Sequence, residues 1–147
     1  MKNTQTILLA GIIAGTLDAL AAIFFYANPL NVHNISRIFR FIASGLFGRT
    51  AYNTGPFYPI AGLILHFGIA TIWSAVYLFI LFRIFKPGFV WAKTILLASL
   101  VWVMMNGFVL PACGFPSRHE GWAIMRSFLI ILFCVSLPVC LIVEKRK

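Results

Sequence analysis

Two ionisable side chains lie inside long apolar runs of this sequence and are its best candidates for chemistry. Asp18 lies in the run 7–27, and His66 lies in the run 60–82. An ionisable group within a membrane is costly unless it faces protein or water, so such residues often mark proton or substrate paths. The sequence therefore predicts that Asp18 and His66 share one cavity, in direct contact or through one water molecule.

Two further polar side chains, Asn106 and Arg126, complete this predicted intramembrane site. From the helix rise of about 1.5 Å per residue, Asp18 and His66 lie roughly 14 and 10 Å from the outer ends of their spans. Asn106 and Arg126 lie about 8 and 6 Å from theirs. An Asp18–His66 or an Asp18–Arg126 pair would offset part of the roughly 2.5–3.5 kcal/mol cost of an intramembrane charge. The alternative is that these residues only join helices, at about 0.6 kcal/mol per polar contact.

Other groups of reactive residues give weaker signals. Haem ligation by two histidines needs two buried imidazoles, yet His33 and His119 are predicted to lie in loops. Cys113, His119 and Glu120 do not match the ligand spacing of known zinc sites. The sequence contains no nucleotide-binding or lipidation motif. We therefore expect no cofactor and no metal site.

The composition is typical of a polytopic membrane protein. Hydrophobic residues make up 61% of the 147 residues and charged residues only 10%, whereas soluble domains contain about 25% charged residues. The apolar runs, about 7–27, 60–82, 89–110 and 122–143, are long enough to cross the hydrocarbon layer as helices. We therefore predict one all-α domain, 1–147, with four transmembrane helices.

The net charge of +9 is explained without nucleic acid. The basic residues stand in short flanks beside the apolar runs, where topology and anionic lipid headgroups account for them. We therefore expect membrane lipids as partners and no nucleic acid.

A short amphipathic helix is predicted between the first and second spans, at about 35–47. Apolar residues, including Leu46, recur with helical period on one side, and Arg37, Arg40 and Ser44 fall on the other. The segment is too short to span, so we expect it to lie in the membrane interface with Arg37 and Arg40 toward headgroups. The alternative is a plain connector between two spans.

Capping and turn residues predict where several elements begin and end. Asn34 is the expected N-cap of the interfacial helix, and the stretch 48–59 is expected to be a loop. Pro111 should stop the third span, Pro138 should kink the fourth, and 144–147 should form a tail.

Small residues predict helix contacts within the first two spans. Gly11, Gly15 and Asp18 recur on one side of the first span, and Gly62 and His66 do so on the second. Such seams allow two helix backbones to approach closely. We expect Gly11, Gly15 and Gly62 to pack against another helix.

The distribution of basic residues predicts the orientation of the chain. With four spans, both termini and the turn between the second and third spans lie on one side of the membrane. That side carries Lys2, Arg83, Lys86, Lys93, Lys145, Arg146 and Lys147, and the other carries Arg37, Arg40, Arg49 and Arg118. Because positive charge is enriched on the cytoplasmic side, we expect both termini to be cytoplasmic.

Four features together resemble a known group of proteins. They are the Gly-x-x-x-Gly pair preceding Asp18, the sequence Ala43-Ser44-Gly45, the pair Gly62 and His66, and Asn106 followed by Pro111. The chain resembles small four-helix bacterial inner-membrane proteins and is loosely similar to the YagU type. This resemblance implies a bacterial inner membrane and brings no reaction and no functional residue with it.

Three functions are compatible with these features. Size, small-residue seams and the lack of catalytic motifs favour a non-enzymatic accessory subunit, or a self-assembling homo-oligomer, in the membrane. The second hypothesis is a small transporter or proton-linked conduit that uses Asp18 and His66. The third is an enzyme that acts on a lipid or quinone, with His66 as general base.

Overall fold

The computed structural model describes residues 3–26, 32–84, 89–114 and 121–145. Nearly all of these residues are helical, and none of them lies in a β-strand. Helical stretches long and apolar enough to cross a membrane are Asn3–Tyr26, Phe57–Ile84, Val90–Ala112 and Gly121–Lys145. The prediction of an all-α chain with four apolar spans is therefore confirmed.

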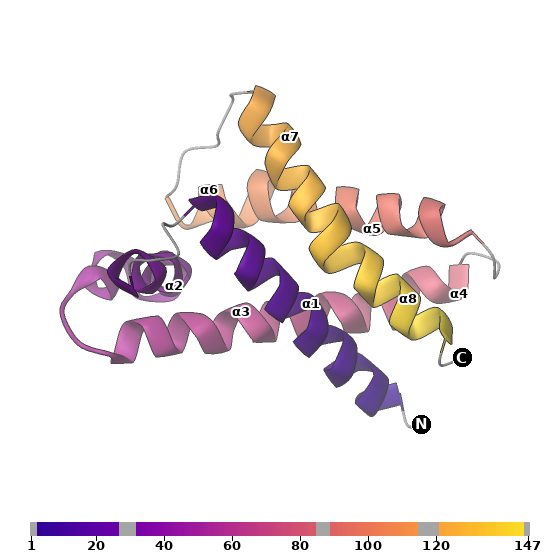
Figure 1. Ribbon diagram of the computed structural model, residues 1–147, viewed down its shortest axis with the longest axis horizontal. Coiled ribbons are helices and arrows are strands. Elements are labelled where there is room, and N and C mark those ends of the chain that lie inside the picture. Colours follow the sequence, from indigo (N-terminus) through magenta and orange to yellow (C-terminus); the bar gives the residue numbers. More distant parts are fainter. Residues whose placement is uncertain (1–2, 27–31, 85–88, 115–120, 146–147) are drawn as a thin grey trace.

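The helices follow one another in a simple order along the chain (Figure 1). The elements are α1 (Asn3–Tyr26), α2 (Val32–Phe47), η1 (Gly48–Tyr52), α3 (Phe57–Val76), η2 (Tyr77–Leu81), α4 (Phe82–Ile84), α5 (Val90–Val103), η3 (Met104–Val109), α6 (Leu110–Ala112), α7 (Gly121–Ile130), η4 (Ile131–Ser136) and α8 (Leu137–Lys145). Of these, η1 is a 3₁₀ turn, and η2, η3 and η4 are π-helical segments that continue the flanking α-helices.

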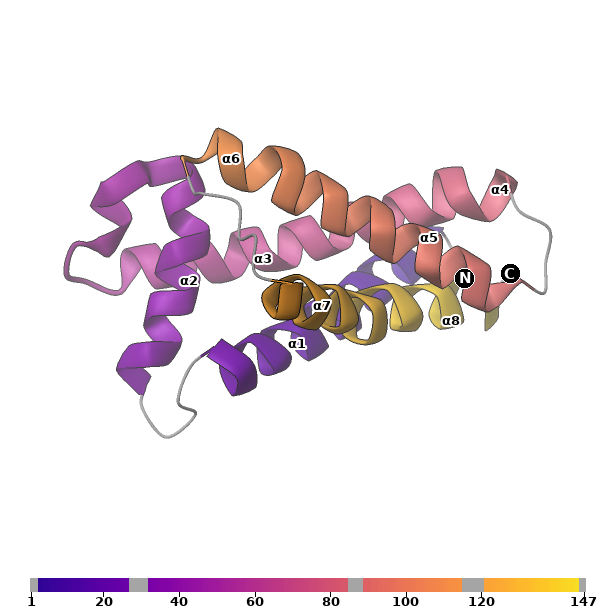
Figure 2. The same cartoon turned by 90° about the horizontal axis from the view of Figure 1, so that it is seen from above.

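The elements divide between two ends of the bundle (Figure 2). The two chain ends and α4 lie at one end, whereas α2 and α6 lie at the other. Helix α2 runs across the long helices instead of along them and packs on the first half of α3. This arrangement places α2 over the end of the bundle at which the polar residues were predicted.

Two of the π-helical segments end two residues before a proline. Pro111 follows η3, and Pro138 follows η4. A proline cannot donate the usual helical hydrogen bond, and its ring crowds the carbonyl four residues earlier. The wider turn of a π-helical segment accommodates both the missing bond and the crowding. The helix of the third span ends at Ala112, one residue after Pro111 and close to its predicted end.

Several predicted boundaries differ from the structure. Helix α2 begins at Val32, so Asn34 lies inside the helix and is not its N-cap. The stretch 48–59 contains η1, and α3 already begins at Phe57, so it is only in part a loop. Glu144 belongs to α8 and not to a tail. The last difference matters most, because helical geometry points Glu144 at a buried lysine, as described below.

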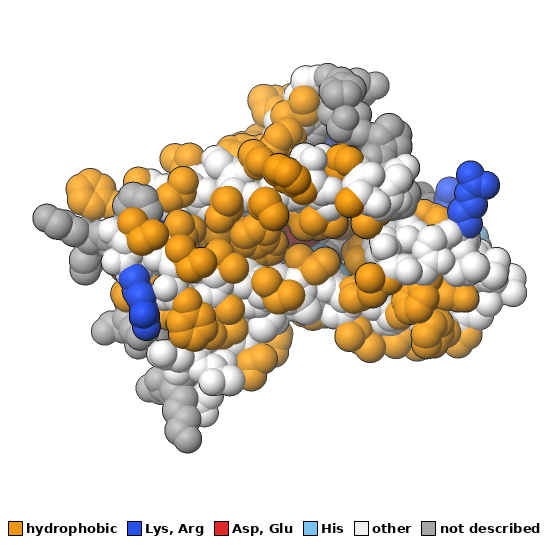
Figure 3. Space-filling view, turned by 180° about the vertical axis from the view of Figure 1, so that it is seen from behind, with side chains coloured by type: hydrophobic (Ala, Val, Ile, Leu, Met, Phe, Trp, Pro, Cys, Tyr) orange, Lys and Arg blue, Asp and Glu red, His pale blue; other side chains and the backbone are white. Residues whose placement is uncertain are grey.

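The main cluster of buried apolar side chains among the described residues lies toward the end of the bundle that carries the termini. It consists of Ala10, Ala14, Tyr77, Leu78, Leu81, Leu97, Val101, Val135, Val139, Cys140 and Val143. These residues come from the terminal-side halves of all four spans. Apolar side chains also cover much of the outer surface, and Lys and Arg appear at its two ends (Figure 3). Such a surface suits a bundle surrounded by lipid.

Candidate functional site

Close contact between α1 and α3 brings the two predicted ionisable residues together. A Cβ added to Gly11 would lie 2.7 Å from Thr71 Cα, and one added to Gly15 would lie 2.7 Å from the Phe67 ring. Only glycine permits this approach, because a methyl group at either position would overlap the neighbouring helix. One turn beyond Gly15 on the same side of α1 stands Asp18, which faces His66 on α3.

His66 is held mainly by the backbone of α1. Its Nε2 lies 2.9 Å from the Gly15 carbonyl oxygen. A carbonyl oxygen only accepts, so Nε2 carries the proton in this bond. The distance from His66 Nε2 to Asp18 Oδ2 is 3.9 Å, which is too long for a direct hydrogen bond but close enough for electrostatic attraction. The two side chains are therefore neighbours without being a bonded dyad.

Two aromatic rings pack against the imidazole of His66. The edge of Phe67 on α3 and that of Phe39 on α2 meet the His66 ring, with centroids 5.6 and 6.4 Å away. The Phe39 backbone also passes directly over Gly62, where an added Cβ would overlap the Phe39 carbonyl oxygen. Helix α2 thus forms a wall of this site and is more than a connector.

Asp18 and His66 line a cavity of about 310 Å³ between the spans. Its walls are otherwise mostly apolar: Ala22, Tyr26, Phe41, Ile42, Ile69, Ala70, Trp73, Val101, Met105, Leu110, Ser127, Ile130, Ile131 and Val135. We call this volume the inner cavity.

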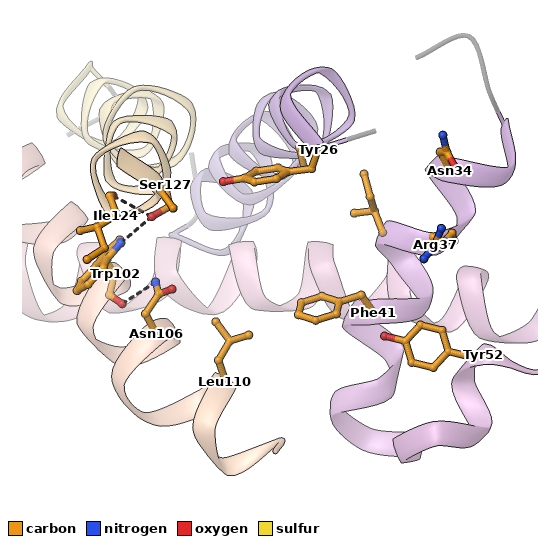
Figure 4. A pocket seen from close by; sticks show the side chains of 13 residues that line it. Tyr26, Asn34, Arg37, Phe41, Tyr52, Trp102, Asn106, Leu110, Ile124 and Ser127 are labelled. Atoms are coloured by element: carbon orange, nitrogen blue, oxygen red, sulfur yellow. Dashed lines mark hydrogen bonds between the residues drawn. The ribbon is translucent and has the colours of Figure 1, made fainter. Parts of the chain in front are cut away.

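A larger cavity of about 800 Å³ adjoins the inner one beneath α2 (Figure 4). We call it the outer cavity. Its lining is more polar, and five residues line both volumes: Ala22, Tyr26, Phe41, Leu110 and Ser127. The remaining lining residues are Asn34, Arg37, Ile38, Tyr52, Trp102, Asn106, Ala123 and Ile124. The shared walls make the two cavities neighbouring parts of one hollow region.

Hydrogen bonds tie one wall of the outer cavity together (Figure 4). Trp102 Nε1 on α5 donates to Ser127 Oγ on α7 at 3.0 Å, and Ser127 Oγ donates to the Ile124 carbonyl at 2.9 Å. Asn106 Nδ2 donates to the Trp102 carbonyl at 3.1 Å. The Trp102–Ser127 bond therefore joins α5 to α7 in this wall, and the other two bonds hold Ser127 and Asn106 against their own helices.

Asn106 and Arg126 do not line the inner cavity with Asp18 and His66. Asn106 lines the outer cavity, whereas Asp18 lines the inner one. The Arg126 guanidinium lies over the Tyr26 ring, 4.7 Å from its centroid, and its Nε is buried without a hydrogen-bond partner among the described residues. Tyr26 lines both cavities, whereas Arg126 lines neither and contacts the Tyr26 ring.

The two arginines of α2 differ sharply. Arg40 donates to the backbone carbonyls of Ala51, Asn53 and Gly55, and thereby fastens η1 and the following turn to α2. Arg37 is exposed and lines the outer cavity. Arg40 therefore has a structural role, whereas Arg37 presents its charge to the cavity.

Two residues from the opposite predicted faces of α2 differ strongly in exposure. Ser44 was predicted on the polar face but is only 5% exposed, and its hydroxyl donates to the Phe41 carbonyl at 2.6 Å. Leu46, predicted on the apolar face, is 70% exposed, which is also the exposure of a side chain that faces lipid. Ala43 and Ser44 are both buried.

A second charged cluster lies at the opposite end of the bundle and was not predicted. Lys93 on α5 has a wholly buried side chain, and its Nζ lies 2.5 Å from Glu144 Oε1 on α8. The Tyr77 hydroxyl donates to the same oxygen at 3.2 Å, and Lys93 Nζ lies 5.3 Å from the Phe82 ring centroid. The sequence did contain a signal for this pair. Glu144 stands four residues after Cys140, so extending the predicted fourth helix by one turn would have placed Glu144 on the same, core-facing side.

Comparisons with protein-family models, curated proteins and solved structures find no match to this chain. The resemblance to the YagU type therefore stays a prediction. His119 and Glu120, weighed above as ligands, lie outside the described residues.

Proposed function

We propose that this protein binds an amphipathic, lipid-like molecule in the hollow region beneath α2. The observation that carries the proposal is the pair of adjoining cavities, one polar and one mainly apolar, between the spans. Small-molecule sites typically enclose about 300–1,000 Å³ and combine apolar walls with a few placed polar groups. Both cavities have this character.

The arrangement of the polar groups suits a molecule with a polar end and an apolar body. Asn34, Arg37 and Asn106 line the outer cavity, and the side chains of Phe41 and Tyr26 continue into the inner one. Asp18 and His66 add polar groups to the otherwise mainly apolar lining of the inner cavity. A ligand lying in this way would keep its apolar part out of water.

The closed end of the bundle argues against a path through the protein. Leu81, Leu97 and Val139 are buried in the core on the terminal side, and the pair Lys93–Glu144 adds a bonded charge there. A conduit needs access from both sides of the membrane, and this half is packed. A binding cavity needs access from one side only.

A general base at His66 is also less well supported than binding. Nε2 donates its proton to the Gly15 carbonyl, so a general base at His66 would have to act through Nδ1. Because the backbone of α1 holds the imidazole in place, we assign His66 a positioning role in the cavity wall.

The membrane setting is part of the same proposal. We place the four spans in a bacterial inner membrane with both termini cytoplasmic, because basic residues are more numerous on the terminal side. The cavities then open in the periplasmic half, and α2 lies near the interface above them. A homo-oligomer or a larger complex is compatible with the apolar outer surface.

The test is to fill the cavity and measure retained lipid. Ala22 lines both cavities, so Ala22→Phe should abolish lipid adducts seen by native mass spectrometry of protein released from nanodiscs. Ala92→Phe is the matched control, since Ala92 is an exposed alanine of α5. Equal retention by the wild type, Ala22→Phe and Ala92→Phe would overturn the proposal. The same spectra report the oligomeric state.

A further inference from the structure

We propose that the outer cavity selects an amphiphile with an anionic phosphate-type headgroup, and that Arg37 is the residue that recognises it. This inference rests on the proposed function and names the class of ligand. Three observations support it: the positive charge of the outer cavity lining, the exposed guanidinium of Arg37, and the change from a more polar lining in the outer cavity to a mainly apolar lining in the inner one.

The charge of the outer cavity has one sign among the described residues that line it. Arg37 is the charged side chain of that lining, and no Asp or Glu belongs to it. Asn34 and Tyr52 lie close along the same wall and add an amide and a hydroxyl that can donate hydrogen bonds (Figure 4). A cation with neighbouring neutral donors is the usual recognition set for phosphate and carboxylate groups.

Arg37 is available for a ligand in a way that its neighbour is not. Arg40 lies one turn further along α2, and its guanidinium donates hydrogen bonds to the backbone carbonyls of Ala51, Asn53 and Gly55. The described contacts of Arg37 include no hydrogen bond or ion pair of this kind, and its side chain is exposed at the cavity. An arginine fork in this state can bind two phosphate oxygens at once.

The inner cavity matches the other part of such a molecule. Tyr26 and Phe41 line both cavities and carry the apolar wall inward toward Ile69 and Ile130. Asp18 lies about 12 Å along α1 from Tyr26, at about 1.5 Å per residue. Asp18 is the one carboxylate among the described lining residues, and it lines the inner cavity and not the outer cavity that Arg37 lines, so an anionic group in the outer cavity meets no lining carboxylate there.

The test compares lipids that differ in headgroup charge. The full chain is placed in nanodiscs containing phosphatidylglycerol and phosphatidylethanolamine with matched acyl chains, and native mass spectrometry measures the ratio of the two retained lipids. We expect wild type to favour phosphatidylglycerol, and Arg37→Gln to reduce that ratio about tenfold, as expected for loss of a charge-assisted hydrogen bond. Arg37→Lys should restore part of the ratio.

Control variants and a soluble competitor make the outcomes distinct. Arg49→Gln removes an exposed charge of η1 that lines neither cavity and should leave the ratio unchanged. Competition by glycerol phosphate at millimolar concentration would show that a soluble phosphate compound, not a lipid, is the source of the group. Retained lipid with equal preference in wild type, or equal effects of Arg37→Gln and Arg49→Gln, would overturn the selection by Arg37 while leaving the cavity proposal intact. Absence of retained lipid in every composition would overturn the proposed function itself.

Discussion

Lys93 is a charged residue whose side chain is wholly buried. Removing an ammonium group from water costs several kcal/mol unless a partner of opposite charge is present. Glu144 supplies that charge, and Tyr77 satisfies a further lone pair of the same carboxylate oxygen. Three spans are thereby joined at the closed end of the bundle.

Removing the carboxylate alone should destabilise the protein. Glu144→Gln leaves Lys93 buried without its counter-charge, and we expect a loss of about 3–5 kcal/mol in the free energy of unfolding. The double variant Lys93→Met with Glu144→Leu should recover most of this, although the Tyr77 hydroxyl then loses its acceptor. Circular dichroism during denaturant unfolding in detergent measures both. Lys145→Gln, an exposed neighbour, should change stability by less than about 0.5 kcal/mol, and an equal loss from it would contradict the assignment.

Asp18 and His66 should be coupled weakly. Their nearest polar atoms are 3.9 Å apart, and His66 is anchored to the Gly15 carbonyl in any case. A double-mutant cycle of Asp18→Asn and His66→Gln on the free energy of unfolding should give a coupling of about 0.5–1 kcal/mol. Pairing Asp18→Asn with Asn106→Ala should be additive, because Asn106 lines the other cavity. Full additivity in both cycles would show that Asp18 and His66 do not interact.

At the scale of elements, the crossing of α2 over α3 depends on one glycine. The backbone of Phe39 occupies the space that a Cβ at Gly62 would need. Because the obstacle is backbone and not a flexible side chain, the two helices must move apart if Gly62 is replaced. That movement would displace Phe39 from His66 and open the wall of the inner cavity.

A matched pair of glycine variants tests this contact. Gly62→Ala should lower the free energy of unfolding by about 1–3 kcal/mol through overpacking. Gly68→Ala, in the same helix, meets nothing within 4 Å and should be neutral or stabilising by up to about 1 kcal/mol, the helix-propensity gain. Thermal unfolding of both variants gives the comparison. If Gly62→Ala proves as well tolerated as Gly68→Ala, α2 does not cross α3 at this point.

At the scale of the whole molecule, the bundle has one packed end and one hollow end. The core and the Lys93–Glu144 pair close the terminal side, and the cavities lie on the side of α2. Which membrane face the hollow end meets depends on the orientation of the chain. Pairing with Glu144 offsets the charge of Lys93, but the remaining basic residues still favour the terminal side.

The orientation has a direct test with reporter fusions. Alkaline phosphatase fused after Gly55 should be active, because that enzyme folds only in the periplasm, and fusion after Lys145 should be inactive. Green fluorescent protein at the same two sites should give the opposite pattern and serves as the control. The reverse pattern would place the cavities in the cytoplasmic half of the membrane.

The sequence alone determined the spans and the depth of the polar groups. Long apolar runs specify membrane-spanning helices without any partner, since every backbone group is satisfied within the helix itself. Helix rise then placed Asp18 and His66 at similar depth, and the small-residue seams of α1 and α3 placed them on contact faces. These properties are local, so they can be derived from the order of residues.

Tertiary structure alone decided how α2 lies, which charges are bonded, and where the hollow region is. Periodicity put Ser44 on a polar face, but the fold buries it, whereas Leu46 stays exposed. In the sequence, Lys93 counted as one of the basic residues that set the membrane orientation. In the fold, α8 brings Glu144, which is distant in sequence, to 2.5 Å from its Nζ. A cavity is the space that several helices fail to fill, so it depends on crossing angles and close approaches that no single segment encodes.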